Sequence, residues 1–215
     1  MRPYKRTIET LELDGGWLCL DFINTVGNRV EVPSICYLPT NNEVLKWAKR
    51  VKLFSSKEIR EITEYNSKYP DIAEKDHKKI INIRETLYQM FSAIANDFPP
   101  TRPVLKKFNK YLSETFNNLK LAVDKNRVVT EDWQKENTGM HQFQFQIIRS
   151  AYELLKSDLL ITLKQCDKCG WLFLDRSKNR SRKWCNMDTC GSSEKSKRYY
   201  HKMKREYEKG DSAPN

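Results

Sequence analysis

Apolar residues recur every three or four positions through much of the first 160 residues, and this spacing predicts amphipathic helices. The clearest pattern covers 76–98 and ends at Pro99. Capping-box sequences mark the starts of two shorter helices. These two helices are expected over 42–50 and over 56–66. Two further helices are expected, one from about Pro103 and one over 139–157. The sequence therefore predicts a mainly helical N-terminal part.

Three segments depart from this periodicity. Alternating polar and apolar residues predict a short strand over 8–13, with a turn at the Asp-Gly-Gly that follows. β-Branched residues on either side of the turn-rich tetrad 124–127 predict a hairpin within 119–133. The apolar segment 17–26 suits either a buried strand or a helix. We expect a fold that is mainly α with small β elements (α+β).

Four of the six cysteines lie near the end of the chain, spaced Cys166-x2-Cys169, then fifteen residues, then Cys185-x4-Cys190. Two close pairs separated by a connector are typical of a tetrahedral zinc site, because each tight turn presents two thiolates. Gly170 after the first pair fits a zinc knuckle. Four thiolates close the coordination shell, so the spacing predicts one structural Zn²⁺ and not a catalytic one.

Other roles for the cysteines are weaker. A thioredoxin-like redox pair lacks a βαβ framework and leaves the second pair unexplained. Disulfides would be favoured in a secreted chain, but the N-terminus holds no apolar run of signal-peptide length. We therefore expect a cytoplasmic protein without a membrane segment. Cys19 and Cys36 have no close partner in the sequence and are expected to be buried free thiols.

Positive charge is concentrated after residue 163. Residues 164–215 hold 14 Lys and Arg against 7 Asp and Glu, a net +7 of the chain's +11. Such a basic surface suggests a polyanionic partner, usually nucleic acid. The candidate contacts lie in the loop between the cysteine pairs (Arg176, Lys178, Arg180, Arg182, Lys183) and after the last cysteine (Lys195, Lys197, Arg198, Lys202, Arg205).

The segment after Cys190 consists of strong helix formers, with Ser192 or Ser193 as its expected N-cap. At 100° per residue its cations form one stripe, whereas Tyr200, Met203 and Tyr207 gather almost opposite. One face of this helix can therefore dock on protein while the other meets phosphate.

Two regions of the chain resemble the parts of a known two-part family. WLFLDRS, KWC and CGSSEKSKRYYHKMK are similar to the CGNR zinc finger, and LDGGWLCLDFINTV resembles the ABATE domain that precedes it. Ser192 and Ser193 replace the Asn and Arg of the signature, which removes one candidate DNA contact. The resemblance implies an ABATE-like helical domain over 1–160, a treble-clef or ribbon-like zinc module with a basic helix over 161–208, and a disordered tail over 209–215. It also implies a transcription regulator whose finger binds DNA.

We therefore expect a DNA-binding regulator whose N-terminal domain senses a small-molecule effector or forms a homo-oligomer. Asp21, Asn24, Thr25 and Arg84 are polar residues in apolar surroundings, which could line an effector pocket or instead satisfy buried backbone groups. The sequence contains no P-loop, GxSxG, HExxH or dinucleotide motif, so no enzyme is expected. The alternatives are a zinc-stabilised RNA-binding or protein-interaction module and, less favoured, an enzyme with an N-terminal small-molecule pocket.

Overall fold

The computed structural model describes residues 6–31, 33–133, 140–193, 196, 199–200 and 203. Within these residues the chain is mainly helical, with two small sheets, as the sequence predicts. The α-helices are α1 (Leu18–Ile23), α2 (Asn41–Arg50), α3 (Ser56–Lys68), α4 (Pro70–Ala95), α5 (Arg102–Asn117) and α6 (His141–Lys156). The other elements are β1 (Leu119–Val123), β2 (Val129–Trp133), η1 (Asp158–Thr162), β3 (Leu163–Gln165), β4 (Leu172–Leu174) and η2 (Met187–Gly191).

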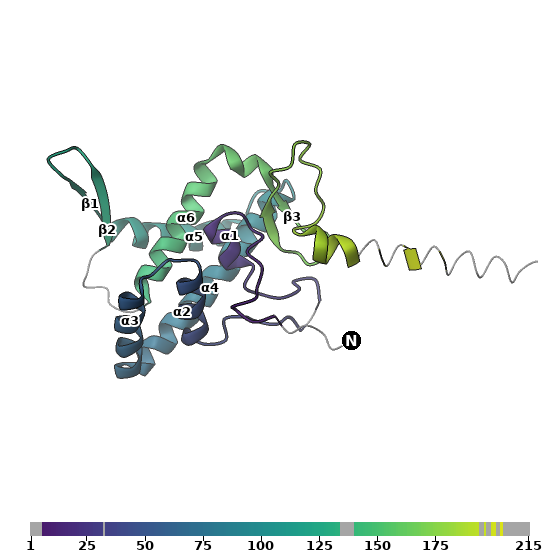
Figure 1. Cartoon of the computed structure of the whole chain (residues 1–215). Coiled ribbons are helices and arrows are strands. Elements are labelled where there is room, and N and C mark those ends of the chain that lie inside the picture. Colours follow the sequence, from purple (N-terminus) through teal and green to yellow (C-terminus); the bar gives the residue numbers. More distant parts are fainter. Residues whose placement is uncertain are drawn as a thin grey trace, which may run out of the picture.

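Helix α4 is the central element of the fold and contacts the other five α-helices as well as β3 and β4 (Figure 1). Ile80 and Leu87 on its apolar stripe are completely buried. Beside it, the rings of Phe22, Trp47 and Phe143 meet with centroids 5.3–5.9 Å apart. Each ring comes from a different helix, so this tilted and edge-to-face packing joins α1, α2 and α6 in one core.

Helix starts follow the local sequence closely. The Thr40 side chain accepts a hydrogen bond from the backbone of Asn42 and caps α2. Ser55 and Glu58 form a complete capping box at the start of α3. Helix α4 begins with Pro70 in its first turn, where the missing N–H has no cost. The longest helix therefore starts six residues earlier than the apolar pattern indicates.

Two details of the sequence-based expectation are corrected, and one that the sequence left open is decided. The strand expected over 8–13 is wrong: the backbone N–H of Leu11 donates to Thr7 at 2.8 Å, so the chain forms a turn. This turn buries Ile8 and Leu11, whose three-residue spacing suits a helical turn better than a strand. The ambiguous segment 17–26 contains helix α1. Phe98 lies past the end of α4 and is 68% exposed.

The expected hairpin is confirmed. Strands β1 and β2 pair antiparallel from Leu119 opposite Trp133 to Val123 opposite Val129. The Asp124 carboxylate closes the turn by accepting backbone N–H bonds from two later residues, each at 2.8 Å. Figure 1 shows this hairpin projecting from the helical body, on the side away from β3.

The cysteine-rich segment packs directly on the helices. Strands β3 and β4 pair antiparallel, with Leu163 opposite Leu174, and lie against α4. Trp171, Phe173 and Cys166 belong to the same buried cluster as the helical core. The hydrophobic core thus continues without interruption into this module. Among the residues that the structure describes, no helix is both long and apolar enough to cross a membrane.

Candidate metal centre and nucleic-acid interface

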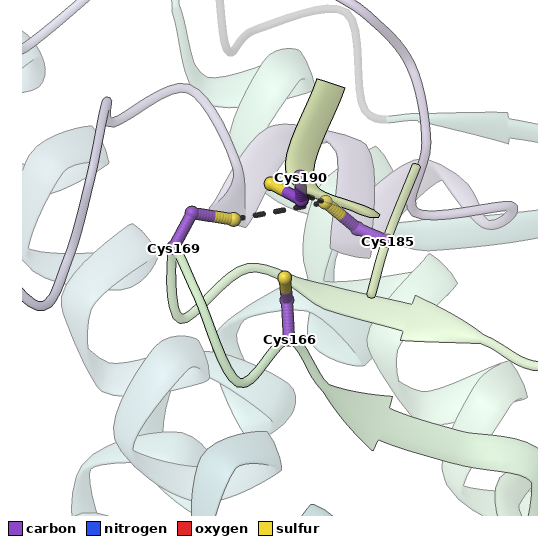
Figure 2. Close-up of side chains that lie close together, drawn as sticks. All are labelled: Cys166, Cys169, Cys185 and Cys190. Carbon is purple, nitrogen blue, oxygen red and sulfur yellow. Dashed lines mark hydrogen bonds between the residues drawn. The ribbon is translucent and has the colours of Figure 1, made fainter. Parts of the chain in front are cut away.

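The sulfur atoms of Cys166, Cys169, Cys185 and Cys190 all lie within 4.8 Å of one another. Figure 2 shows the four side chains pointing toward one another; two come from the turn after β3, one from the loop that follows β4, and one from η2. The sulfurs of Cys169 and Cys185 are 3.6 Å apart, far longer than a disulfide bond, and all six cysteines are free thiols. The two sequence pairs therefore meet as one donor set.

The first pair lies on a tight turn that only glycine fits well. The Gly170 N–H donates to the carbonyl of Cys166 at 2.9 Å, and the Cys166 N–H donates to the carbonyl of Trp171 at 2.8 Å. Gly170 has φ +73°, and a Cβ at this position would lie 3.1 Å from the Cβ of Arg29. The backbone conformation and the close approach both require glycine here.

Electrostatics explain why this cluster needs a cation. Hydrogen bonding from Cys169 first, and then from Cys185 and Cys190, lowers the pKa of Cys166. Hydrogen bonding with Cys166 first, and then with Cys169 and Cys190, raises the pKa of Cys185. Four sulfurs this close therefore cannot all ionise by themselves, whereas a divalent ion stabilises every thiolate. The all-cysteine donor set with a closed shell fits one structural Zn²⁺, which when bound supplies folding free energy and no catalysis.

The second pair fixes the start of the C-terminal helix. The side chain of Asn186 caps η2 by accepting backbone N–H bonds from Asp188 at 2.8 Å and from Thr189 at 3.3 Å. Cys190 lies within this first turn. Ser192 is already helical, with φ −63° and ψ −42°, so the prediction that a serine caps the helix is wrong. A zinc ion bound by Cys190 would therefore hold this helix at its N-terminal end.

Beyond this start the structure describes only some helix positions. Residues 192, 193, 196, 199, 200 and 203 are helical, and both Tyr200 and Met203 are exposed. The remaining members of the expected basic and apolar faces lie outside the described residues. These are Lys195, Lys197, Arg198, Lys202, Arg205 and Tyr207.

The loop between the cysteine pairs is organised by Asp175, which sequence analysis overlooked. This fully buried carboxylate accepts hydrogen bonds from the backbone and hydroxyl of Ser177 at 3.0 and 2.6 Å, and from the backbone of Arg182 at 2.9 Å. Lys164 forms an ion pair with it at 3.0 Å. Burial alone would raise the pKa of Asp175, but these partners outweigh it and hold the pKa well below its usual range. An apolar strand ending in Asp, with Ser two residues later, is the Asx-turn signal that could have identified it.

Most of the loop's predicted contact residues face solvent. Those that are exposed are Arg176, Lys178, Arg180 and Lys183. Arg182 differs, because it is half-buried with its guanidinium 5.0 Å from the Phe173 ring. The same side chain donates to the carbonyls of Trp184, at 3.2 Å, and of Cys185. Arg182 therefore supports the backbone at the third cysteine.

The polar residues of the N-terminal motif mainly make structural hydrogen bonds. Asn24 pairs with both backbone groups of Leu172 in β4, at 2.8 and 3.0 Å. Thr25 donates its hydroxyl to the carbonyl of Phe22 at 2.7 Å. Asp21 accepts a bond of 2.8 Å from the backbone of Gly15. The motif therefore docks α1 on the zinc module through Asn24.

Arg84, the fourth expected pocket residue, lines a cavity of about 420 Å³ between α4 and the segment 26–36. Its Nη1 also donates to Thr25, at 3.3 Å to the hydroxyl. Cys36 lies at the same cavity and is exposed, so the expectation of a buried thiol is wrong for Cys36 and right for Cys19. The segment that carries Cys36 passes over the surface, a position that residue type alone cannot reveal.

Comparison with known families agrees with both resemblances. Residues 16–158 match the ABATE family model, described as "Putative stress-induced transcription regulator", and residues 162–203 match the CGNR zinc finger. A search of the curated proteins found no match. Both families are of regulator and zinc-finger types and not enzyme families. Since the first match spans more than half of the sequence, the chain belongs to the ABATE family and carries a CGNR zinc finger with one structural zinc site.

Proposed function

We propose that this protein is a DNA-binding transcription regulator of the cytoplasm whose zinc finger presents a basic loop and a basic helix to duplex DNA. The observation that carries the proposal is the buried carboxylate of Asp175, which fixes both ends of an exposed cationic loop beside the metal centre. A loop supported from inside presents its cations in a fixed arrangement, which suits contact with a regular phosphate backbone.

Pre-ordering favours binding through this loop. Lys164 neutralises Asp175 and also donates to the carbonyls of Arg180 and Arg182, so the loop backbone is held while Lys178 and Arg180 stay exposed. A loop that is already ordered loses less conformational entropy when it meets the DNA backbone. Lysine and arginine there would contact phosphates, and arginine can also pair with guanine.

The N-terminal domain would sense an effector or mediate assembly, and it has a direct route to the finger. Asn24 joins α1 to β4, and Arg29 donates its backbone N–H to the carbonyl of Cys169 at 2.9 Å. Because these contacts are directional, and the pair at Asn24 is also buried, a shift of α1 or of the segment after it would move the zinc module.

The test compares two double variants that each remove two positive charges. Lys178→Ala with Arg180→Ala alters the loop, while Lys120→Ala with Lys125→Ala alters exposed positions of the distant hairpin and serves as the matched control. Fluorescence anisotropy with a random duplex, titrated with salt, gives the affinity and its salt slope. Each lost phosphate contact lowers that slope by about 0.9, so the loop variant should lose about 2 and the control almost nothing.

Zinc content must stay at the wild-type level in both variants, so that any change reflects contacts and not unfolding. Equal slopes for the two variants would overturn the role of the loop. Equal affinity for structured RNA would favour an RNA-binding function, and zinc retention without salt-dependent binding would favour a protein partner. Competition by genomic fragments against random DNA then measures specificity.

A further inference from the structure

The cavity beside the zinc knuckle contains more buried positive charge than its contacts neutralise. The side chains of Arg29 and Arg84 are only 7% and 5% exposed. Both contact the same carboxylate, that of Glu85, at 2.9 and 2.8 Å. Burial alone would raise the pKa of Glu85, but the two guanidinium groups lower it, so this carboxylate is charged. Two cations therefore share one anion.

The remaining acidic residue at the cavity does not remove this excess. Glu31 lines the exposed rim, and within the described chain it forms no ion pair with either arginine. Buried arginines in proteins are nearly always paired, because an unpaired charge keeps its desolvation cost. The two buried guanidinium groups at this cavity thus carry one positive charge more than the single carboxylate paired with them neutralises.

Hydrogen bonding points to the same deficit. Arg84 uses Nε for Glu85 and Nη1 for Thr25 and Cys36, while its Nη2 has no hydrogen-bond partner among the described residues. Among the described residues, Nε of Arg29 is buried and has no partner. Guanidinium groups have five donors, and buried donors left unsatisfied are costly. An anion entering beside Arg84 would use the free donor and supply the missing charge.

We propose that this cavity binds a small organic anion, whose carboxylate or phosphate group pairs with Arg84 in the positive field of Arg29. Either group can accept from the N–H bonds of Nη2, the guanidinium nitrogen that Glu85, Thr25 and Cys36 leave free. The volume of about 420 Å³ has room for an organic body besides the charged group. Val26 and the Tyr88 ring, over which Arg29 lies at 3.8 Å, offer this body apolar contact.

The position of the cavity connects it to the finger. Arg29 donates its backbone N–H to Cys169, and its Cβ would meet a side chain at Gly170 at 3.1 Å. The anion would therefore bind against the back of the first cysteine pair. That this anion is the effector of a regulator rests on the proposed function; the cavity then gives the chemical class of that effector.

Cys36 provides a site-specific reporter of binding. It is exposed at the cavity, and Arg84 Nη1 lies 3.3 Å from its sulfur. The zinc-loaded full chain is treated with iodoacetamide in inorganic phosphate, in succinate, or in chloride of equal ionic strength, and mass spectrometry follows the Cys36 peptide. An anion at ten times its dissociation constant should slow the alkylation of Cys36 by about tenfold relative to chloride. Protection by phosphate alone, by succinate alone, or by both identifies the preferred group.

A charge variant tests whether the protection comes from the cavity. Gln89→Glu places a carboxylate at an exposed position of the cavity lining, where it should compete with the anion and abolish protection. Asn109→Asp adds the same charge at an exposed position of α5 and should leave protection intact. No protection by either anion in the wild type, or equal protection in Gln89→Glu, would overturn the site. Because no DNA is present, this failure is distinct from a failure of DNA binding.

Discussion

The side chain of Asn24 is one of the polar links between the helical domain and the zinc module, and its removal gives a quantitative prediction. Asn24 is 1% exposed, and it forms hydrogen bonds with both the carbonyl and the N–H of Leu172 at 2.8 and 3.0 Å. Leu172 is itself completely buried. In Asn24→Ala both backbone groups lose their side-chain partner in a site that water does not reach. Each buried unsatisfied group costs about 1–3 kcal/mol, so the free energy of unfolding should fall by about 2–6 kcal/mol.

A loss of this size is a large fraction of the roughly 5–15 kcal/mol that stabilises a typical domain. Urea unfolding followed by far-ultraviolet circular dichroism, with zinc in constant excess, measures it through the shift of the midpoint at unchanged m value. Asn24→Asp is informative as a second variant. It keeps the acceptor for the Leu172 N–H but places a buried negative charge against the Leu172 carbonyl, so part of its loss should be recovered on acidification.

The matched control is Asn109→Ala on the exposed face of α5, which should change stability by no more than about 0.5 kcal/mol. If Asn24→Ala costs less than about 1 kcal/mol, the argument that these two bonds dock the zinc module is refuted. The same conclusion would follow if the control variant lost as much stability as Asn24→Ala.

Three further predictions concern the metal centre and the N-terminal motif. Cys190→Ala should bind zinc well below the wild-type stoichiometry in elemental analysis, because three thiolates leave the shell open; unchanged zinc content would contradict the four-cysteine site. Burial raises the pKa of Asp21 to about 6 from an ordinary value of 3.8, so the folded state keeps a proton that the unfolded state releases, and stability should fall as pH rises between these values. This decline in the free energy of unfolding is worth about 1–3 kcal/mol, and urea midpoints measured across this pH range should not show it in Asp21→Asn. A decline of the same size in the variant would exclude Asp21 as its source. Gly170→Ala should lower the melting temperature more than Gly16→Ala does. Both glycines have φ above +70°, but only a Cβ at Gly170 would lie 3.1 Å from another residue, at the Cβ of Arg29. Equal losses of melting temperature would show that φ alone matters.

Several features could be predicted from the sequence because they depend on neighbours in the chain. The capping box at Ser55 and the turn at Asp124 need only residues within four positions, and both were predicted where they occur. The zinc site was predictable for a related reason. Each pair of cysteines is a local turn, and the metal chemistry itself requires the pairs to meet, so Cys166 and Cys190 are implied by spacing alone.

Other features were wrong or missed because they depend on distant contacts. Residues 8–13 alternate like a strand, but they have no partner strand in the described structure and form a turn. The serines after Cys190 resemble an N-cap, yet the helix already starts at Met187 because Asn186 caps the turn that carries the last ligand. In both cases the tertiary arrangement, set by packing and by the zinc site, overrides the local conformational preference.

The sequence by itself determined the kind of molecule: a helical domain, a hairpin, four cysteines in a zinc pattern and a basic C-terminal end. Periodicity, caps and ligand spacing are properties of the chain, so they can be read without coordinates. Only the tertiary structure decided what the isolated polar residues do. Asn24 joins a strand 148 residues away, Asp175 holds a loop, and Arg29 and Arg84 enclose an anion-deficient cavity. Those roles arise from burial and from pairing between distant segments, which no local pattern records.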